Sequence, residues 1–326
     1  MFAGQLWSVN TLGGFMYADN LSAKLRMAVQ PMVKFRQFCD IKDAAHQGLH
    51  KGQTFHWDVY SDVSAQGTTL TETNTMPETN FTITQGTMTI TEFGQAVPYT
   101  GKLEALAEHK VTEIINKVLK NDALKAFDNA AAAEFNKTAL RYSMTQDTGT
   151  YALTTDGTPT QTNSAPLGTA AVAHISTLMQ ERNIPAYTGS DYYAIALPTV
   201  FLPLQIALEG IQQYTPQGFG MIMNSEIGRY HNVRFVTQTH IGHSGMGYVA
   251  GDWTNGLSNW ALFFGEDTVA EAIAIPEEVR AKIPTDFGRS QAIAWYYLGG
   301  FGLTHDSTNG YSPVANERIV MWDSAA

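Results

Sequence analysis

The chain has 326 residues, of which 44% are hydrophobic and only 15% charged, and its formal net charge is -10. An acidic chain disfavours a dedicated nucleic-acid-binding protein, which needs a basic surface to displace counterions from the phosphates. Cys39 is the single cysteine, which excludes an intrachain disulfide and a thiolate metal cluster and indicates synthesis in a reducing compartment.

The N-terminal region is basic and has a helical pattern. From Asn20 to Phe38 apolar residues recur at helical spacing, which predicts an amphipathic helix with a kink at Pro31. Leu21–Lys51 has six basic residues against two acidic ones, a local charge of +4 that leaves -14 for the rest. A basic segment on an acidic body indicates contact between copies of the chain, and a solvated helix face is the alternative. The chain start lacks the pattern of a secretory signal, and no apolar run has the length of a membrane span, so we expect neither.

Residues 50–100 predict an extended β-hairpin. Gln53–Val63 alternates apolar and polar residues as a strand does, Ser64–Asn80 is a polar, Thr-rich tip, and strand alternation then resumes. The alternation changes phase at Gln85-Gly86, where we predict a β-bulge. A hairpin of this kind is marginally stable alone in water, so we expect it to lie on another surface.

A long helix and a turn-rich connection follow. Gly101–Lys137 has an apolar stripe with a period of 3.6 residues and a weak point at Asn121-Asp122. If unbroken, this helix would be about 50 Å long, at 1.5 Å per residue. The stretch Thr145–Gly168 is rich in turn residues and predicts a connection without a helix.

The C-terminal half mixes helices and strands. Thr169–Arg182 predicts a helix that ends before Pro185, and Tyr192–Leu197 predicts a buried central strand because it is wholly apolar. Further strands are predicted over Asn232–Thr239, Trp260–Gly265, Ala292–Leu303 and Glu317–Trp322. The strands are too scattered for a repeating βαβ series, so we predict a mixed α+β body.

One motif resembles a nucleotide-binding signature. His240-Ile241-Gly242-His243 matches the signature of class I aminoacyl-tRNA synthetases, but the lysine-containing partner motif is missing, since the only later lysine is Lys282. Glycines surround both histidines and no carboxylate follows until Asp252, so we predict exposed loop histidines and no metal site. The same stretch has Met246 where a nucleophile elbow needs glycine. A hydrolase or transferase acting through His240 or His243 is the remote alternative.

Other candidate sites lack the residues that their chemistry needs. The "DFG" within Thr285–Arg289 has no Gly-rich loop and no "HRD" segment before it, so we predict a turn in which Asp286 pairs with Arg289 or caps the next element. No pattern in the sequence places an acid and a base around one pocket, although carboxylate pairs exist at Glu277-Glu278 and at Asp58 with Asp62. We therefore predict no catalytic, cofactor-binding or metal-binding residue, and no enzyme activity.

The order of these parts, together with four stretches, carries a family resemblance. The stretches are "TMTITEFGQAVPYTGKLEAL", "SEIGRYHNVRFVTQTHI", "ALFFGEDTVAEA" and "DFGRSQAIAWYYLGGFGL". With them the chain resembles the major capsid proteins of tailed bacteriophages, which have the HK97-like fold. One departure is His231-Asn232, where the family pattern commonly has glycine, and Asn tolerates the left-handed turn expected there.

The resemblance implies a division of the α+β fold into five parts. They are an N-terminal arm at 1–49, an extended hairpin called the E-loop at 50–100, and the spine helix with the P-domain connection at 101–168. Residues 169–265 then form mainly the A domain, and residues 266–326 form the return strands of the A and P domains.

The resemblance also implies a function and partners. The chain is expected to be a structural subunit of an icosahedral shell of hexamers and pentamers, made in the bacterial cytoplasm and enclosing phage double-stranded DNA without sequence-specific binding. An encapsulin-type nanocompartment shell is the alternative. Copies would contact one another through the E-loop and the N-terminal arm. A separate scaffolding protein and a portal are further expected partners, and no membrane is. In some members of the family that the chain resembles, a lysine on the E-loop joins neighbouring subunits covalently. No lysine lies between Gly52 and Thr100 of this chain, so the resemblance implies a shell stabilised by noncovalent contacts or by a cement protein.

Overall fold

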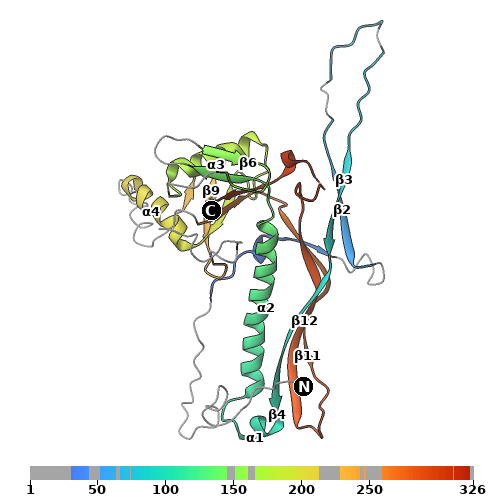
Figure 1. Cartoon of the computed structure of the whole chain (residues 1–326), viewed down its shortest axis with the longest axis vertical. Helices are drawn as coiled ribbons and strands as arrows, with labels where there is room; N and C mark the ends of the chain where they lie inside the picture. Colours follow the sequence, from blue (N-terminus) through green and yellow to red (C-terminus); the bar gives the residue numbers. More distant parts are fainter. Residues whose placement is uncertain are drawn as a thin grey trace.

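The structure, a computed structural model, describes residues 31–43, 52–63, 67–73, 75–144, 151–160, 166–212, 228–242, 246, 259–310 and 312–323. The molecule is elongated: the helix α2 runs along a long sheet, a rounded body of sheet and helices lies at one end, and a hairpin projects beyond that body (Figure 1). This mixed α+β architecture confirms the predicted fold class.

In chain order the first elements are η2 (Arg36–Phe38), β1 (Asp40–Asp43), β2 (Thr54–Tyr60), β3 (Ile83–Thr89), β4 (Thr91–Thr100), α1 (Gly101–Leu106) and α2 (Val111–Phe135). The body contains β5 (Arg141–Met144), β6 (Tyr151–Thr154), α3 (Thr169–Glu181), β7 (Tyr192–Ala196), α4 (Pro198–Gln212), β8 (Arg229–Tyr230) and β9 (Val233–Thr237). The last elements are β10 (Ala261–Phe264), β11 (Val269–Ala281), β12 (Ser290–Leu303), η5 (Val314–Asn316) and β13 (Ile319–Trp322).

The long sheet has four strands in the order β1-β11-β12-β4, and α2 packs against it. Aromatic rings fill the contact, with Phe127 of α2 in edge-to-face contact with Trp295 and Tyr297 of β12. The indole Nε1 of Trp295 donates to the Asp122 carboxylate at 2.9 Å. Asp122, which belongs to the weak point predicted from the sequence, is therefore hydrogen-bonded to the sheet, and α2 continues through this position.

A seven-stranded sheet, in the order β6-β5-β13-β10-β7-β9-β8, lies at the centre of the body. Its middle strands alternate between two cores: Leu262 and Phe264 of β10 face the core shared with α2, while Ala261 and Phe263 face the core under α3 and α4. Because both faces are covered, these strands are apolar at every position, which is the pattern that the sequence showed.

The hairpin strands β2 and β3 pair in one unbroken antiparallel register, from Thr54 opposite Thr89 to Tyr60 opposite Ile83. The predicted bulge at Gln85-Gly86 is therefore wrong. Gly86 has another role, because a Cβ atom there would overlap the indole ring of Trp57, which lies directly over it. The phase change in the sequence arises because the apolar residues at the two ends of β3 face opposite sides of the hairpin.

Two helix predictions also need correction. The long helix breaks at residues 107–110, between α1 and α2, and not at Asn121-Asp122. The helix predicted for Asn20–Phe38 is absent from its described part, since residues 31–35 have no regular secondary structure and only one 3-10 turn follows. Its remainder, with the kink, lies outside the described residues.

The C-terminal predictions agree better with the structure. The helix at Thr169–Arg182 is α3, and the predicted strands correspond to β7, β9, β10, β12 and β13. The sequence missed α4, which begins at Pro198 and contains Pro203, and it missed β6 inside the turn-rich connection. None of the helices that the structure describes is long and apolar enough to cross a membrane.

Candidate functional site

The hairpin carries several exposed apolar side chains. The outward side chains of Tyr60, Phe81 and Ile83 are 79%, 58% and 62% exposed on a hairpin that projects away from the body (Figure 1). Between Gly52 and Thr100 the chain has five carboxylates and no lysine or arginine. Exposed apolar side chains on an acidic, projecting hairpin indicate a surface that another molecule covers.

The base of the hairpin is fixed to the body. Phe55 of β2 and Met88 of β3 are buried against two alanines of β11. The Trp57 indole donates its Nε1 hydrogen to the carbonyl oxygen of Thr304 at 3.0 Å, and its ring also approaches Gly302. The hairpin is thus held in one direction at its base.

A cleft of about 770 Å³ lies between β2 and the body. Its walls are most of the hairpin residues between Phe55 and Asp62, the end of α3 with the turn after it, Asp267 and Ala270 around the start of β11, Thr304 and His305 after β12, and residues 315–318 in and after η5. The His305 side chain lines this cleft, is 6% exposed, and has no hydrogen-bond partner on either ring nitrogen. Its Nε2 lies 3.4 Å from an Asp267 oxygen. Asp267 is thus the acidic neighbour of this buried imidazole.

The segment around η2 is fixed by a buried ion pair. Arg36 contacts Glu271, which is 0% exposed, at 2.7 Å and the more exposed Glu277 at 3.0 Å. The guanidinium also lies 4.3 Å from the centre of the Phe127 ring of α2. Burial by itself lowers the pKa of Arg36, but the hydrogen bonds and charges of the two glutamates outweigh it and raise that pKa above its usual value. This basic residue therefore serves an intrachain contact.

The structure corrects the prediction for His240. Its side chain is 11% exposed, and its Nδ1 lies 3.1 Å from the Asp128 carboxylate on α2. The other oxygen of Asp128 accepts the backbone N–H of Phe35 at 2.7 Å. His240 is therefore mostly buried, and the prediction of an exposed loop histidine is wrong. Its contact with Asp128 joins its loop to α2 next to Phe35. His243 lies outside the described residues.

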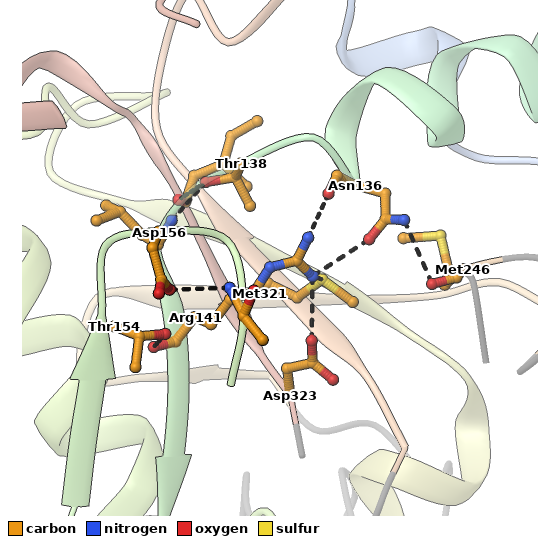
Figure 2. A network of polar contacts seen from close by, with 11 residues as sticks. Asn136, Thr138, Arg141, Thr154, Asp156, Met246, Met321 and Asp323 are labelled. Atoms are coloured by element: carbon orange, nitrogen blue, oxygen red, sulfur yellow. Dashed lines mark hydrogen bonds and ion pairs between the residues drawn. The ribbon is translucent and has the colours of Figure 1, made fainter. Parts of the chain in front are cut away.

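A second buried network ties the end of α2 to the seven-stranded sheet (Figure 2). Arg141 of β5 donates to Asn136, the C-terminal cap of α2, and to the Asp323 carboxylate after β13 at 3.1 Å. The Asn136 amide in turn donates to the carbonyl of Met246 at 3.3 Å. Because Arg141 is buried, this network is structural and offers no access to a substrate.

The carboxylates singled out in the sequence have separate hydrogen-bond or ion-pair partners, although Asp58 and Asp62 line the same cleft. Glu277 pairs with Arg36, Glu278 pairs with Arg280, and Asp58 accepts a hydrogen bond from Gln85. Asp286 lies 3.5 Å from Arg289 in the turn between β11 and β12, as predicted. No three His, Cys, Asp or Glu side chains of the described ranges are grouped so that they could hold a metal ion.

Sequence reasoning missed the cleft. Thr304 and His305 follow the predicted strand Ala292–Leu303, and their position under the hairpin depends on contacts more than 200 residues apart in the chain. The only local signal was the presence of a histidine and an aspartate directly after the apolar strand β12. That signal is weak without the fold.

Comparison with solved structures identifies the fold. The chain is similar to the capsid structure of cyanophage P-SCSP1u, with 14% identity over 100% of this chain and 99% of that one and a TM-score of 0.68. The capsid of Ralstonia phage GP4 matches with 12% identity, 98% coverage of both chains and a TM-score of 0.66. The chain has the fold of phage capsid subunits.

A third match to this capsid fold is cyanophage Pam1, with 12% identity, coverage of 95% of this chain and 97% of that one, and a TM-score of 0.68. No protein-family model matches the sequence, and no curated protein is similar to it. The capsid fold is thus recognised through the order and geometry of its elements over nearly the whole chain.

Proposed function

We propose that this chain is the major capsid protein of a tailed phage, a structural subunit that assembles with its own copies into an icosahedral shell around double-stranded DNA. The projecting hairpin carries the proposal, because it exposes apolar side chains that no described part of the same chain covers. In a shell a neighbouring copy would cover them. The likeness of the whole chain to phage capsid subunits supports the same conclusion.

Other features of the molecule fit repeated self-association. Among the residues that the structure describes, both edges of the four-stranded sheet are unpaired along most of their length, since β1 pairs with only four residues of β11 and β4 pairs only with β12. Open edges and exposed apolar residues give several weak contacts on each copy, and a closed symmetric assembly makes them strong together. Hexamers and pentamers are the expected units of such a shell.

The proposed partners follow from the resemblance to phage capsid proteins, together with the charge of the chain and the composition of the hairpin. An acidic shell, at -10 per chain, would repel DNA and leave it free to pack and to leave. A separate scaffolding protein and a portal would be needed during assembly. With no lysine between Gly52 and Thr100, the shell would be stabilised by noncovalent contacts or by a cement protein. The virion is the proposed location, after assembly in the host bacterial cytoplasm.

Electron microscopy of the purified chain tests the proposal. We expect closed shells from the full chain, whereas a variant that lacks Ala65–Pro77 should give folded subunits without stable shells. The folded state of that variant is checked by circular dichroism. Normal shells from the deletion variant, or no shells from the full chain with a scaffolding protein present, would contradict the proposal.

An encapsulin-type compartment is the alternative shell, since it has the same fold but encloses enzymes. The content of the particles decides between them: double-stranded DNA of genome length in particles from infected cells supports the phage capsid, and protein cargo supports the compartment. The fold alone is common to both alternatives.

An enzyme acting through His240 is a poorer explanation, because this histidine is mostly buried against Asp128. We expect a variant with both His240→Ala and His243→Ala to form shells as complete as those of the unaltered chain, provided that its subunits are folded. Loss of turnover of a substrate with normal assembly would favour the enzyme.

A further inference from the structure

The side of α2 that faces away from the long sheet carries three lysines. The helix packs mainly against β12 and β4, and Figure 1 shows the long sheet along one side of it. On its other side Lys117 and Lys120 are exposed, and Lys125 is half-buried. Two apolar side chains lie among them, Val118 and Leu124, which are 53% and 40% exposed. We call the three lysines the lysine face.

The lysine face has no partner within the described part of the chain. None of its three amines makes a hydrogen bond or an ion pair with a described residue. By contrast Lys110, at the start of the same helix, lies 3.1 Å from the Glu113 carboxylate. Exposed lysines of surface helices are commonly balanced in this way by a carboxylate three or four residues away.

The carboxylates in this part of α2 are bound elsewhere. Asp122 accepts the indole N–H of Trp295 at 2.9 Å. Asp128 is buried, accepts the backbone N–H of Phe35 and lies 3.1 Å from Nδ1 of His240. Between residues 114 and 133 the helix has no other carboxylate. The lysine face is therefore a basic surface on a chain whose net charge is -10.

The spacing of the lysines indicates an anion that carries several charges. Lys117 and Lys120 are three residues apart, so their side chains lie on the same side of the helix and repel each other. From Lys117 to Lys125 the helix rises by about 12 Å, at 1.5 Å per residue. A ligand with negative charges along this length would relieve the repulsion at all three positions.

Charge also indicates which ligand fits. The segment Leu21–Lys51 has six basic residues and two acidic ones, so the lysine face would repel it. The hairpin of a neighbouring copy is acidic, but its exposed side chains such as Phe81 and Ile83 are apolar and would desolvate the amines without pairing them. Double-stranded DNA carries one negative charge per about 1.7 Å of its axis, so a duplex beside α2 presents several phosphates over the same length.

We infer that the lysine face lines the interior of the shell and contacts the phosphates of the packaged DNA. The inference rests on the proposed function and names the surface of the subunit that meets the DNA. A lysine amine is a point charge, so its contact with a phosphate carries no sequence information. Because the chain as a whole is acidic, the attraction is local, and the DNA stays free to leave the shell.

Acetylation of lysines in filled and emptied particles tests the contact. Particles from infected cells are treated with sulfosuccinimidyl acetate before and after release of their DNA, and mass spectrometry gives the rate at each lysine. We expect the lysine face to react about tenfold more slowly while DNA is present, because phosphates then hold its amines. Lys282, which donates to Ser290 between β11 and β12, is the internal control and should react equally in both states.

Three outcomes of this experiment would overturn the inference. Equal rates at the lysine face in filled and emptied particles would show that DNA does not contact it. Protection in both kinds of particle, relative to unassembled subunits, would show that a neighbouring copy covers it. Protection that is confined to shells still containing a scaffolding protein would assign the face to that protein.

Charge reversal gives a second test. A variant with Lys117→Glu, Lys120→Glu and Lys125→Glu should form empty shells in normal yield, but its yield of DNA-filled particles should fall by about tenfold. The matched control replaces the same three lysines by arginine, which keeps the charge and should keep the yield of filled particles. Loss of empty shells from the glutamate variant, with subunits that circular dichroism shows to be folded, would mean that the face binds protein and would overturn the inference.

A milder variant covers the case in which the glutamate variant does not fold. Replacement of the three lysines by glutamine removes their charge without adding a negative one, and it should lower the yield of filled particles in the same direction. A normal yield of filled particles from folded glutamine-variant subunits would count against the contact.

The outcomes separate this inference from the proposed function. If the unaltered chain forms DNA-filled shells but the lysine face reacts equally with and without DNA, the proposed function stands and the inference is wrong. If the unaltered chain forms no shells with a scaffolding protein present, the proposed function itself fails.

Discussion

At the scale of single residues, Gly86 shows how one missing side chain fixes the base of the hairpin. The Trp57 indole occupies the space that a Cβ at position 86 would take, and this placement lets its Nε1 reach Thr304. Gly86→Ala would displace the indole and break that hydrogen bond. The expected cost is about 1–3 kcal/mol of unfolding free energy, the usual penalty of overpacking.

Urea unfolding of unassembled subunits, followed by tryptophan fluorescence, measures this cost. Gly67→Ala is the matched control, because a Cβ at position 67 meets no atom within 4 Å. A Gly86→Ala subunit as stable as the control would show that the indole can move without loss.

Glu134 gives a prediction for pH. This carboxyl is largely buried next to Lys137, and burial raises its pKa above the ordinary value of 4.5, although Lys137 opposes the shift. An acid with a raised pKa in the folded state subtracts stability once the pH exceeds its unfolded pKa, and most fully above its folded pKa. Glu134→Gln should therefore raise the unfolding free energy at pH 7, and this gain should vanish as the pH falls toward 4.

Unfolding by urea at several pH values from about 4 to about 8 checks this dependence. Glu113→Gln is the control, because Glu113 makes an exposed pair with Lys110 on the same helix and should change stability little at any pH. A gain for Glu134→Gln that stays constant across the range would contradict a raised pKa.

At the scale of elements, η2, the long sheet and α2 meet at Arg36. Replacement by methionine would keep the contact with Phe127 but leave Glu271, which is fully buried, without its cation. Breaking a buried pair in this way costs about 3–5 kcal/mol. We expect Arg36→Met to lose about this much unfolding free energy and to release β1 from β11.

Glu277→Gln is the control for this pair, since its carboxylate is 47% exposed and should contribute about 1 kcal/mol or less. Urea unfolding gives the free energies, and hydrogen exchange of residues 40–43 reports the release of β1. If Arg36→Met and Glu277→Gln lower the unfolding free energy by the same amount, the buried pair does not keep β1 on β11.

The elements also show what the sequence can and cannot predict. Strands such as β10 and β13 were predicted because burial on both faces makes them wholly apolar, a property that is local in the sequence. The prolines of α4 misled the prediction, since Pro198 starts that helix, where its missing N–H is harmless, and Pro203 lies inside it. The role of Gly86 depends on its contact with Trp57, and that of His240 on its contact with Asp128. No local sequence pattern shows such partners.

At the scale of the whole molecule, the hairpin is the part that the isolated chain stabilises least. Beyond Tyr60 and Ile83 no strand pairing holds its described residues, and only a few contacts such as the Ser61–Thr82 hydrogen bonds remain. By contrast, β10 and β13 lie at the centre of the seven-stranded sheet, where every residue is buried. Local stability should differ widely between these regions.

Hydrogen exchange before and after assembly measures this difference. In unassembled subunits we expect residues 67–73 and 75–82 to exchange as fast as an unfolded peptide, while β10 and β13 are protected. In shells the same hairpin residues should be protected by about tenfold or more, because a neighbouring copy then covers Phe81 and its apolar neighbours and excludes water from their backbone. Slow exchange at β10 and β13 in both states is the internal control. Hairpin exchange that is equally fast in subunits and in shells would mean that this apolar surface stays uncovered, and the hairpin would then not be the contact that holds the copies together.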